Sequence, residues 1–149
     1  MDYAKDKPIQ TALHVCRGNW SKDESILLRG PYTALVPLFE QTLPDILALE
    51  FSTERAGELA SLLESETLRE KCILGLGVIN PRSDEIESVD QIVQKAEQAL
   101  AYLPPERIHL NPDCGFATFA NRPVNVLDTI ERKLAVLNEA QTVLRNRYE

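Results

Sequence analysis

The sequence contains few of the residues that define several specialised classes of protein. Its 149 residues include 3 Cys and 2 His, and 16 Lys and Arg are outnumbered by 23 Asp and Glu. Three widely spaced cysteines do not make a disulfide framework, and a net charge of −7 disfavours binding to nucleic acid. No apolar run approaches the roughly 18 residues of a membrane span, and residues 1–7 lack the apolar region of a signal peptide. We therefore expect a cytoplasmic protein with reduced thiols and neither a membrane nor a nucleic acid as partner.

Short apolar runs alternate with segments of helical spacing along the whole chain. The apolar runs are 11–16, 46–51, 72–79 and 107–111, and the helical segments are 32–41, 54–65, 89–102 and 126–147. Continuous apolar character is typical of strands that are covered on both faces. Strands that alternate with helices indicate βα units and a parallel sheet. The sequence thus predicts a single α/β domain over residues 1–149.

The number of units restricts the architecture. They recur about every 30–35 residues, as in a (β/α)8 barrel of eight units. Four parallel strands cannot close a barrel, and an open half leaves two unpaired edges. The pattern is therefore compatible with a small doubly wound sheet or with half of a barrel that another chain completes.

Potential metal ligands are concentrated at the ends of the predicted strands. His14 and Cys16 are two residues apart, and so lie on the same side of the first strand. Glu50 lies near the end of the second strand, and Cys114 follows the fourth. Each has an ordinary alternative, because His and Cys also pack in cores and Glu50 could cap a helix or pair with Arg17. Their joint placement at the carboxyl edge of the sheet favours a tetrahedral Zn²⁺ site.

Other sequence features give weaker signals. Cys72 begins its strand at the opposite edge, and His109 lies within a strand, so we expect both to be structural. The Gly75-Leu76-Gly77 segment lacks the third glycine of a dinucleotide-binding loop. Neither a Walker motif nor a Gly-x-Ser-x-Gly elbow is present.

The segments around these residues resemble one known family. The motifs Leu13–Asn19, Leu49–Ser52, Leu76–Val78 and Asn111–Phe116 occur in the same order in the C-terminal catalytic barrel of cobalamin-independent methionine synthases. The resemblance runs from about residue 11 to the final helix, and implies the second half of a (β/α)8 barrel. It also implies a set of zinc ligands, which matches His14, Cys16, Glu50 and Cys114.

The resemblance implies a zinc-dependent methyltransferase of methionine biosynthesis. A methyl-tetrahydrofolate is the implied donor, and a homocysteine-like thiol is the implied acceptor. The motifs place Asn19 and Ser52 as weak candidates for substrate binding. Arg82 aligns near a histidine that is a proposed proton donor of the family. Since a guanidinium stays protonated, Arg82 is a poor acid, but it could bind a carboxylate as a fork.

An acidic motif in the first half of the family's barrel has no counterpart in this sequence. We therefore expect a partial catalytic domain, inactive alone, that is completed by a complementary half-barrel chain or by a second copy. Two alternatives stay open: a non-catalytic half-barrel with a zinc-binding or structural role, and a zinc alkyltransferase with a different thiol acceptor.

Overall fold

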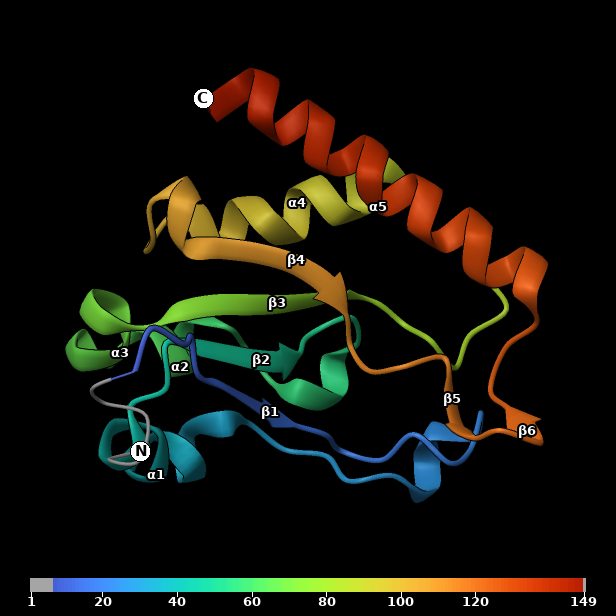
Figure 1. Ribbon diagram of the computed structural model, residues 1–149, viewed down its shortest axis with the longest axis horizontal. Helices are drawn as coiled ribbons and strands as arrows, with labels where there is room; N and C mark the ends of the chain where they lie inside the picture. Colours follow the sequence, from blue (N-terminus) through green and yellow to red (C-terminus); the bar gives the residue numbers. More distant parts are fainter. Residues whose placement is uncertain (1–6, 149) are drawn as a thin grey trace.

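A computed structural model describes residues 7–148 and contains a four-stranded parallel sheet (Figure 1). Its strands lie in sequence order: β1 (Ala12–Val15), β2 (Ile46–Glu50), β3 (Ile73–Ile79) and β4 (Ile108–Pro112). The helices between and after them are α1 (Val36–Thr42), α2 (Ala60–Leu63), α3 (Glu66–Lys71), α4 (Val89–Leu100) and α5 (Leu127–Tyr148). The predicted α/β fold with four βα units is confirmed. None of the helices within 7–148 combines the length and the apolar character needed to cross a membrane.

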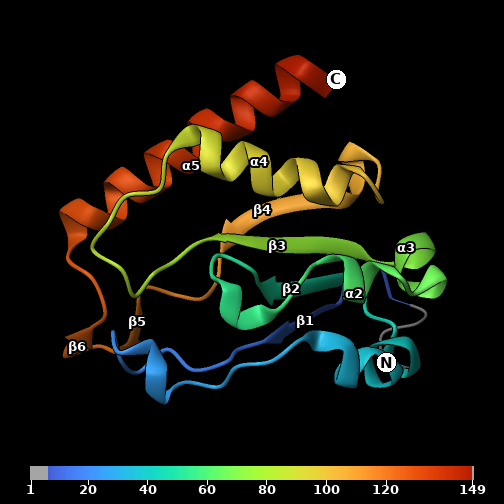
Figure 2. The ribbon, with the colours of Figure 1, turned by 180° about the vertical axis from the view of Figure 1, so that it is seen from behind.

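The two long helices follow the sequence prediction. At the start of α4, Ser88 and Gln91 form the predicted capping box, in which each side chain bonds the other residue's backbone N–H. Helix α4 packs on β3 and β4, and α5 packs on α4 and β4. Figures 1 and 2 show α5 beyond α4 at the β4 end of the sheet, with α1 near β1 at the other end.

The predicted helix over 54–65 is wrong in extent. The segment divides into the 3-10 helix η4 (Glu54–Ala56) and the short helix α2, and α3 then begins after Ser65. Gly57 separates the first two because its φ of 73° lies in the left-handed region that other residues avoid. Ser65 starts α3 by accepting a hydrogen bond from the N–H of Leu68.

The strand register divides the sheet into two chemically different faces. Leu47, Leu49, Leu74 and Leu76 are aligned on one face, where each is at most 3% exposed within the hydrophobic core. The opposite face carries a row of aligned residues: His14, Ala48, Gly75 and His109. Both histidines of this row are exposed. In a closed barrel this second face would be the interior.

Both outer strands of the sheet have a partner on one side only. Among residues 7–148, β1 pairs with β2 alone and β4 pairs with β3 alone. The remaining strands, β5 (Ala117–Phe119) and β6 (Arg122–Pro123), form a separate antiparallel hairpin. That hairpin lies beyond the carboxyl end of β4 (Figure 1).

Candidate metal centre

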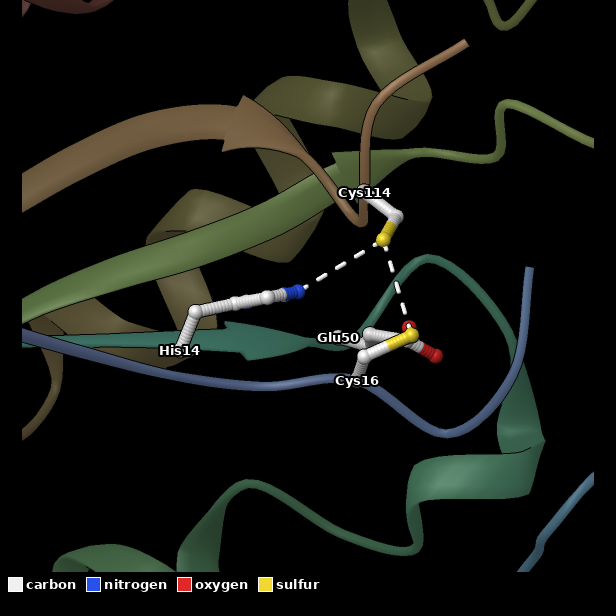
Figure 3. A group of neighbouring side chains, drawn as sticks. All are labelled: His14, Cys16, Glu50 and Cys114. Carbon is white, nitrogen blue, oxygen red and sulfur yellow. Dashed lines mark hydrogen bonds between the residues drawn. The ribbon is translucent and has the colours of Figure 1, made fainter. Parts of the chain in front are cut away.

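The four predicted ligands converge at the carboxyl edge of the sheet (Figure 3). One ligand atom from each of His14, Cys16, Glu50 and Cys114 lies within 4.8 Å of the others. The Sγ atom of Cys114 is 3.6 Å from that of Cys16 and 3.5 Å from Nε2 of His14. His14 and Cys16 are neighbours on one strand, whereas Glu50 and Cys114 are distant in sequence, and three strand ends bring the four together.

These separations suit tetrahedral zinc. Two sulfur ligands about 2.3 Å from Zn²⁺ at the tetrahedral angle are about 3.8 Å apart, and a sulfur and a nitrogen ligand are about 3.6 Å apart. The observed spacings of Cys114 from Cys16 and from His14 are close to these values. The donor set of one nitrogen, two sulfurs and one carboxylate also belongs to the chemistry of Zn²⁺. The residues present therefore fit the metal that the sequence predicts.

The backbone of β2 orients the imidazole ring. Nδ1 of His14 lies 2.9 Å from the carbonyl oxygen of Ala48. Because a carbonyl oxygen only accepts, Nδ1 carries the proton, and Nε2 presents its lone pair to the cluster. This arrangement is the usual support for a metal-ligating histidine.

A glycine turn after β1 supports the first sulfur. Gly18 has a φ of 109°, and its N–H donates to Sγ of Cys16 at 3.3 Å. Burial raises the pKa of the Cys16 thiol above its ordinary value of 9.0; the bond from Gly18 opposes the shift, and Cys114 and Glu50 add to it. A divalent cation beside the Cys16 sulfur would offset this cost by stabilising the thiolate.

Glu50 is almost completely buried, with 2% of its surface exposed. Its Oε1 accepts from the backbone N–H of Arg17, and its Oε2 accepts from Nη2 of Arg55, each at 3.1 Å. The N–H of Glu50 donates to the hydroxyl of Tyr32 at 3.0 Å. Each carboxylate oxygen has two lone pairs, so these bonds fix the side chain and leave it able to bind a metal.

Asp113, next to Cys114 in sequence, ties the β4 loop to the β2 loop. This carboxylate is 1% exposed and accepts from the backbone N–H groups of Phe51 and Ser52 at 3.1 and 3.0 Å. It also accepts from the Ser52 hydroxyl and from Nη2 of Arg82. Burial raises the pKa of Asp113 above its ordinary value of 3.8, and the bonds from Ser52 act against that rise. Cys114 thus follows a residue that is fixed to the segment after Glu50.

The structure places Arg82 behind the cluster. Its side chain is fully buried and pairs with Glu24 and Asp113, at 3.2 Å each. The carboxylates that it binds are thus the protein's own. The catalytic role of Arg82 stays a prediction, and its burial and its two ion pairs do not favour that role.

The two weak candidates for substrate binding have internal partners. Nδ2 of Asn19 donates to the carbonyl oxygen of Gly115 at 2.6 Å, and Asn19 is 5% exposed. The Asn19 carbonyl accepts from the hydroxyl of Thr118 in β5, so the hairpin is fastened to the loop after β1. The Ser52 hydroxyl is bound to Asp113. Both residues support the loops around the cluster.

Sequence reasoning missed Arg55 and Glu24, which lie behind the candidate ligands. Arg55 is 6% exposed and donates to Glu50, and Glu24 contacts both Arg55 and Arg82. Both lie in 3-10 turns, where no periodic pattern marks a buried position. The only available signal was their position in loops that follow the first two strands.

A hollow of about 480 Å³ adjoins the cluster on the uncovered face of the sheet. Its lining includes His14 and Cys114 from the cluster, together with Ala48 and Gly75. The small size of Ala48 and Gly75 keeps the centre of this face open. A small molecule therefore has room beside the candidate ligands.

Comparison with known proteins identifies the family. Residues 3–130 match the catalytic domain of cobalamin-independent synthases. The chain belongs to this family. Methionine synthase of Pyrococcus abyssi is 32% identical over 114 residues, which cover 76% of this chain and 29% of that protein. The 5-methyltetrahydropteroyltriglutamate–homocysteine methyltransferase of Bacillus cytotoxicus is 35% identical over 101 residues, or 68% of this chain and 13% of that protein.

The family members are longer than the chain. Methionine synthase of Pyrococcus furiosus aligns with 95% of this chain at 28% identity, but the match covers 35% of that protein. A solved B12-independent methionine synthase from Shewanella sp. W3-18-1, in complex with selenomethionine, superposes with a TM-score of 0.76 at 21% identity. The superposition covers 97% of this chain and 41% of that chain. The predicted half-barrel fold is confirmed.

Proposed function

We propose that the chain is the zinc-binding half of a methyltransferase barrel. In this proposal His14, Cys16, Glu50 and Cys114 bind Zn²⁺. The observation that carries it is the convergence of their four ligand atoms within 4.8 Å at the strand ends. The family supports a methyltransferase of the methionine synthase type, and the names of the relatives point to homocysteine as acceptor and a methyl-folate as donor.

In the proposed methyl transfer, the residues around the cluster orient the metal ligands. The bond from His14 to Ala48 presents Nε2, while Arg17 and Arg55 hold the Glu50 carboxylate. When bound, Zn²⁺ lowers the pKa of a coordinated thiol, so that the substrate sulfur reacts as a thiolate at neutral pH. The hollow beside His14 and Cys114 provides the room for that thiol.

The methyl carbon exchanges its bond to the donor nitrogen for a bond to the acceptor sulfur, and the nitrogen then requires a proton. Arg82 is unsuited to supply it, because a guanidinium stays protonated and this one is enclosed by Glu24 and Asp113. We infer that the proton comes from solvent or from the remainder of the barrel. That remainder, either a complementary half-barrel or a second copy, would also cover the exposed sheet face.

The first test is metal content. The chain should hold about one Zn²⁺ after reconstitution under reducing conditions, and Cys114→Ser should lose it. Cys72→Ser is the matched control, because Cys72 is 3% exposed in the core and donates to the carbonyl of Pro44. Mass-spectrometric metal analysis measures the outcome. Absence of zinc from the wild-type chain, or its retention in Cys114→Ser, would contradict the assignment.

The second test is methyl transfer with a supplied first half-barrel. Methylation of homocysteine from a methyl-folate is the expected result. Alkylation of another thiol in its place would indicate a different acceptor. A zinc-loaded, assembled protein that transfers no methyl group would indicate a binding or structural role.

A further inference from the structure

Five charged side chains form a continuous series of ion pairs behind the candidate metal centre. Nη2 of Arg55 is 3.1 Å from Oε2 of Glu50, and Nε of Arg55 is 3.4 Å from Oε2 of Glu24. The other oxygen of Glu24 is 3.2 Å from Nε of Arg82. Nη2 of Arg82 is in turn 3.2 Å from Oδ2 of Asp113. The series thus alternates in charge and connects the loops that follow all four strands of the sheet.

Glu24 occupies the centre of this series. Its side chain is 26% exposed, whereas those of the other four members are at most 3% exposed. Each of its carboxylate oxygens faces one arginine, and Nδ2 of Asn80 also donates to Oε1 at 2.8 Å. Glu24 is therefore the shared partner of two buried guanidinium groups.

Both ends of the series reach the candidate ligands. Glu50 is itself one of the four. At the other end, Asp113 precedes Cys114 in sequence and bonds the backbone of Phe51 and Ser52, which follow Glu50. A substitution of Glu24 is therefore expected to affect two candidate ligands: Glu50 through Arg55, and Cys114 through Arg82 and Asp113.

We propose that Glu24 is a positioning residue of the metal centre. Because Arg55 is attracted to the carboxylates of both Glu24 and Glu50, Glu24 weakens the hold of Arg55 on Glu50 and keeps the Glu50 carboxylate available to the metal. This inference rests on the zinc site proposed above. Without the negative charge of Glu24, Glu50 is the remaining carboxylate paired with Arg55. Their attraction, in a poorly solvated site, then competes with the attraction of the cation for the Glu50 carboxylate.

The charge balance of the site supports this role. Three carboxylates, of Glu24, Glu50 and Asp113, are matched by three buried arginines: Arg55 and Arg82 pair with them, and the Arg17 guanidinium bonds the carbonyl oxygen of Arg55. Two thiolates balance Zn²⁺ in the same way. Neutralising Glu24 leaves an excess positive charge beside a site for a cation, and this also weakens metal binding. Loss of such outer partners typically costs about 10–100-fold in metal affinity.

The test is the dissociation constant for Zn²⁺, measured by competition with a chelator of known affinity. Glu24→Gln should bind zinc about tenfold more weakly than the wild type, or weaker still. Glu24→Asp keeps the charge and should bind more tightly than Glu24→Gln. Asp84→Asn is the control, because Asp84 pairs with Lys22 at the surface, outside the series. It should match the wild type.

A double-mutant cycle separates positioning from a general loosening of the loops. If Glu24 acts through Glu50, Glu24→Gln should weaken zinc binding much less when Glu50→Gln is already present. An equal loss in both backgrounds, or no loss in Glu24→Gln alone, would overturn the inference and leave the zinc site intact. A wild-type chain that binds no zinc would instead overturn the proposed function, and this inference with it.

Discussion

At the scale of single residues, Gly77 shows how closely the backbone is packed behind the candidate metal centre. A Cβ atom built at this position would overlap Oδ1 of Asp113 and would lie 2.6 Å from the carbonyl oxygen of Leu49. The strand therefore has space for a hydrogen atom alone. This close approach lets the Asp113 carboxylate lie against β3 while it bonds the loop after β2.

We predict that Gly77→Ala lowers the free energy of unfolding by about 1–3 kcal/mol, because the added methyl group displaces Asp113 or the backbone of β2. Gly115→Ala is the matched control in the loop after β4. Its Cβ would meet a single neighbour, the carbonyl oxygen of Ala117 at 3.9 Å. This control should change stability by less than about 0.5 kcal/mol. Urea denaturation of the metal-free variants measures both values, and equal losses would contradict the prediction.

The cluster could be predicted from sequence because its residues occupy strand ends. The spacing of His14 and Cys16 and the positions of Glu50 and Cys114 follow from the strand assignments alone, and the structure brings the four together. Glu24 could not be found in this way. Its partners lie 31 and 58 positions further along the chain, and an irregular loop gives no period from which a contact could be inferred.

At the scale of secondary-structure elements, a side-chain clamp joins the starts of β1 and β2. Oδ2 of Asp45 accepts from the N–H and the hydroxyl of Thr11 at 2.6 and 2.7 Å. In return, the N–H of Asp45 donates to the Thr11 hydroxyl at 3.1 Å. These bonds fix the edge strand β1 at the end of the sheet opposite the cluster.

The clamp predicts a dependence of stability on pH. The hydrogen bonds from Thr11 lower the pKa of Asp45 below its ordinary value of 3.8. A carboxylate whose pKa is lowered by folding stabilises the protein above its unfolded pKa, and this contribution disappears as the pH falls through the lowered pKa. The wild type should thus be more stable than Asp45→Asn at neutral pH.

Below pH 3.8 the difference between the two proteins should shrink. Thermal unfolding of both across an acid series tests this expectation. Asp128→Asn is a suitable control, because the Asp128 side chain is 82% exposed and its ion pair with Arg132 is as long as 4.0 Å. A difference for Asp45→Asn that stays constant into strong acid would show that the clamp does not act through charge.

The elements differ in how far sequence predicts them. The strands were predictable because continuous apolar runs mark segments buried in a sheet, and their observed bounds differ from the predicted ones by at most one residue. The hairpin of β5 and β6 was missed because its strands are three and two residues long, too short for a periodic pattern to mark them. The irregular segment after β2 was misjudged because its helical spacing concealed the turn at Gly57.

At the scale of the whole molecule, the unpaired edges of the open sheet favour association with another chain. Strands β1 and β4 pair on one side only within residues 7–148, and such edges are templates for further strands. A family member of known structure contains more than twice the length matched by this chain. We therefore expect the isolated chain to self-associate at its strand edges.

A charged residue on the edge strand should reduce this association. Ala12 is exposed on β1, and Ala12→Lys adds a charge of the kind that blocks pairing at sheet edges. Ala101→Lys, at an exposed position after α4, carries the same change away from the edge. Light scattering should show a smaller mean mass for Ala12→Lys than for Ala101→Lys. A wild-type chain that is a uniform monomer would contradict the expectation.

The location of all four candidate ligands on one half-barrel also bears on the order of assembly. Three strand ends of this chain supply His14, Cys16, Glu50 and Cys114, and the face beside them lies open. On the proposed assignment, this half-barrel carries the complete ligand set, so that it is able to bind the metal before the barrel is closed. Metal binding by this half then does not depend on the half that covers it.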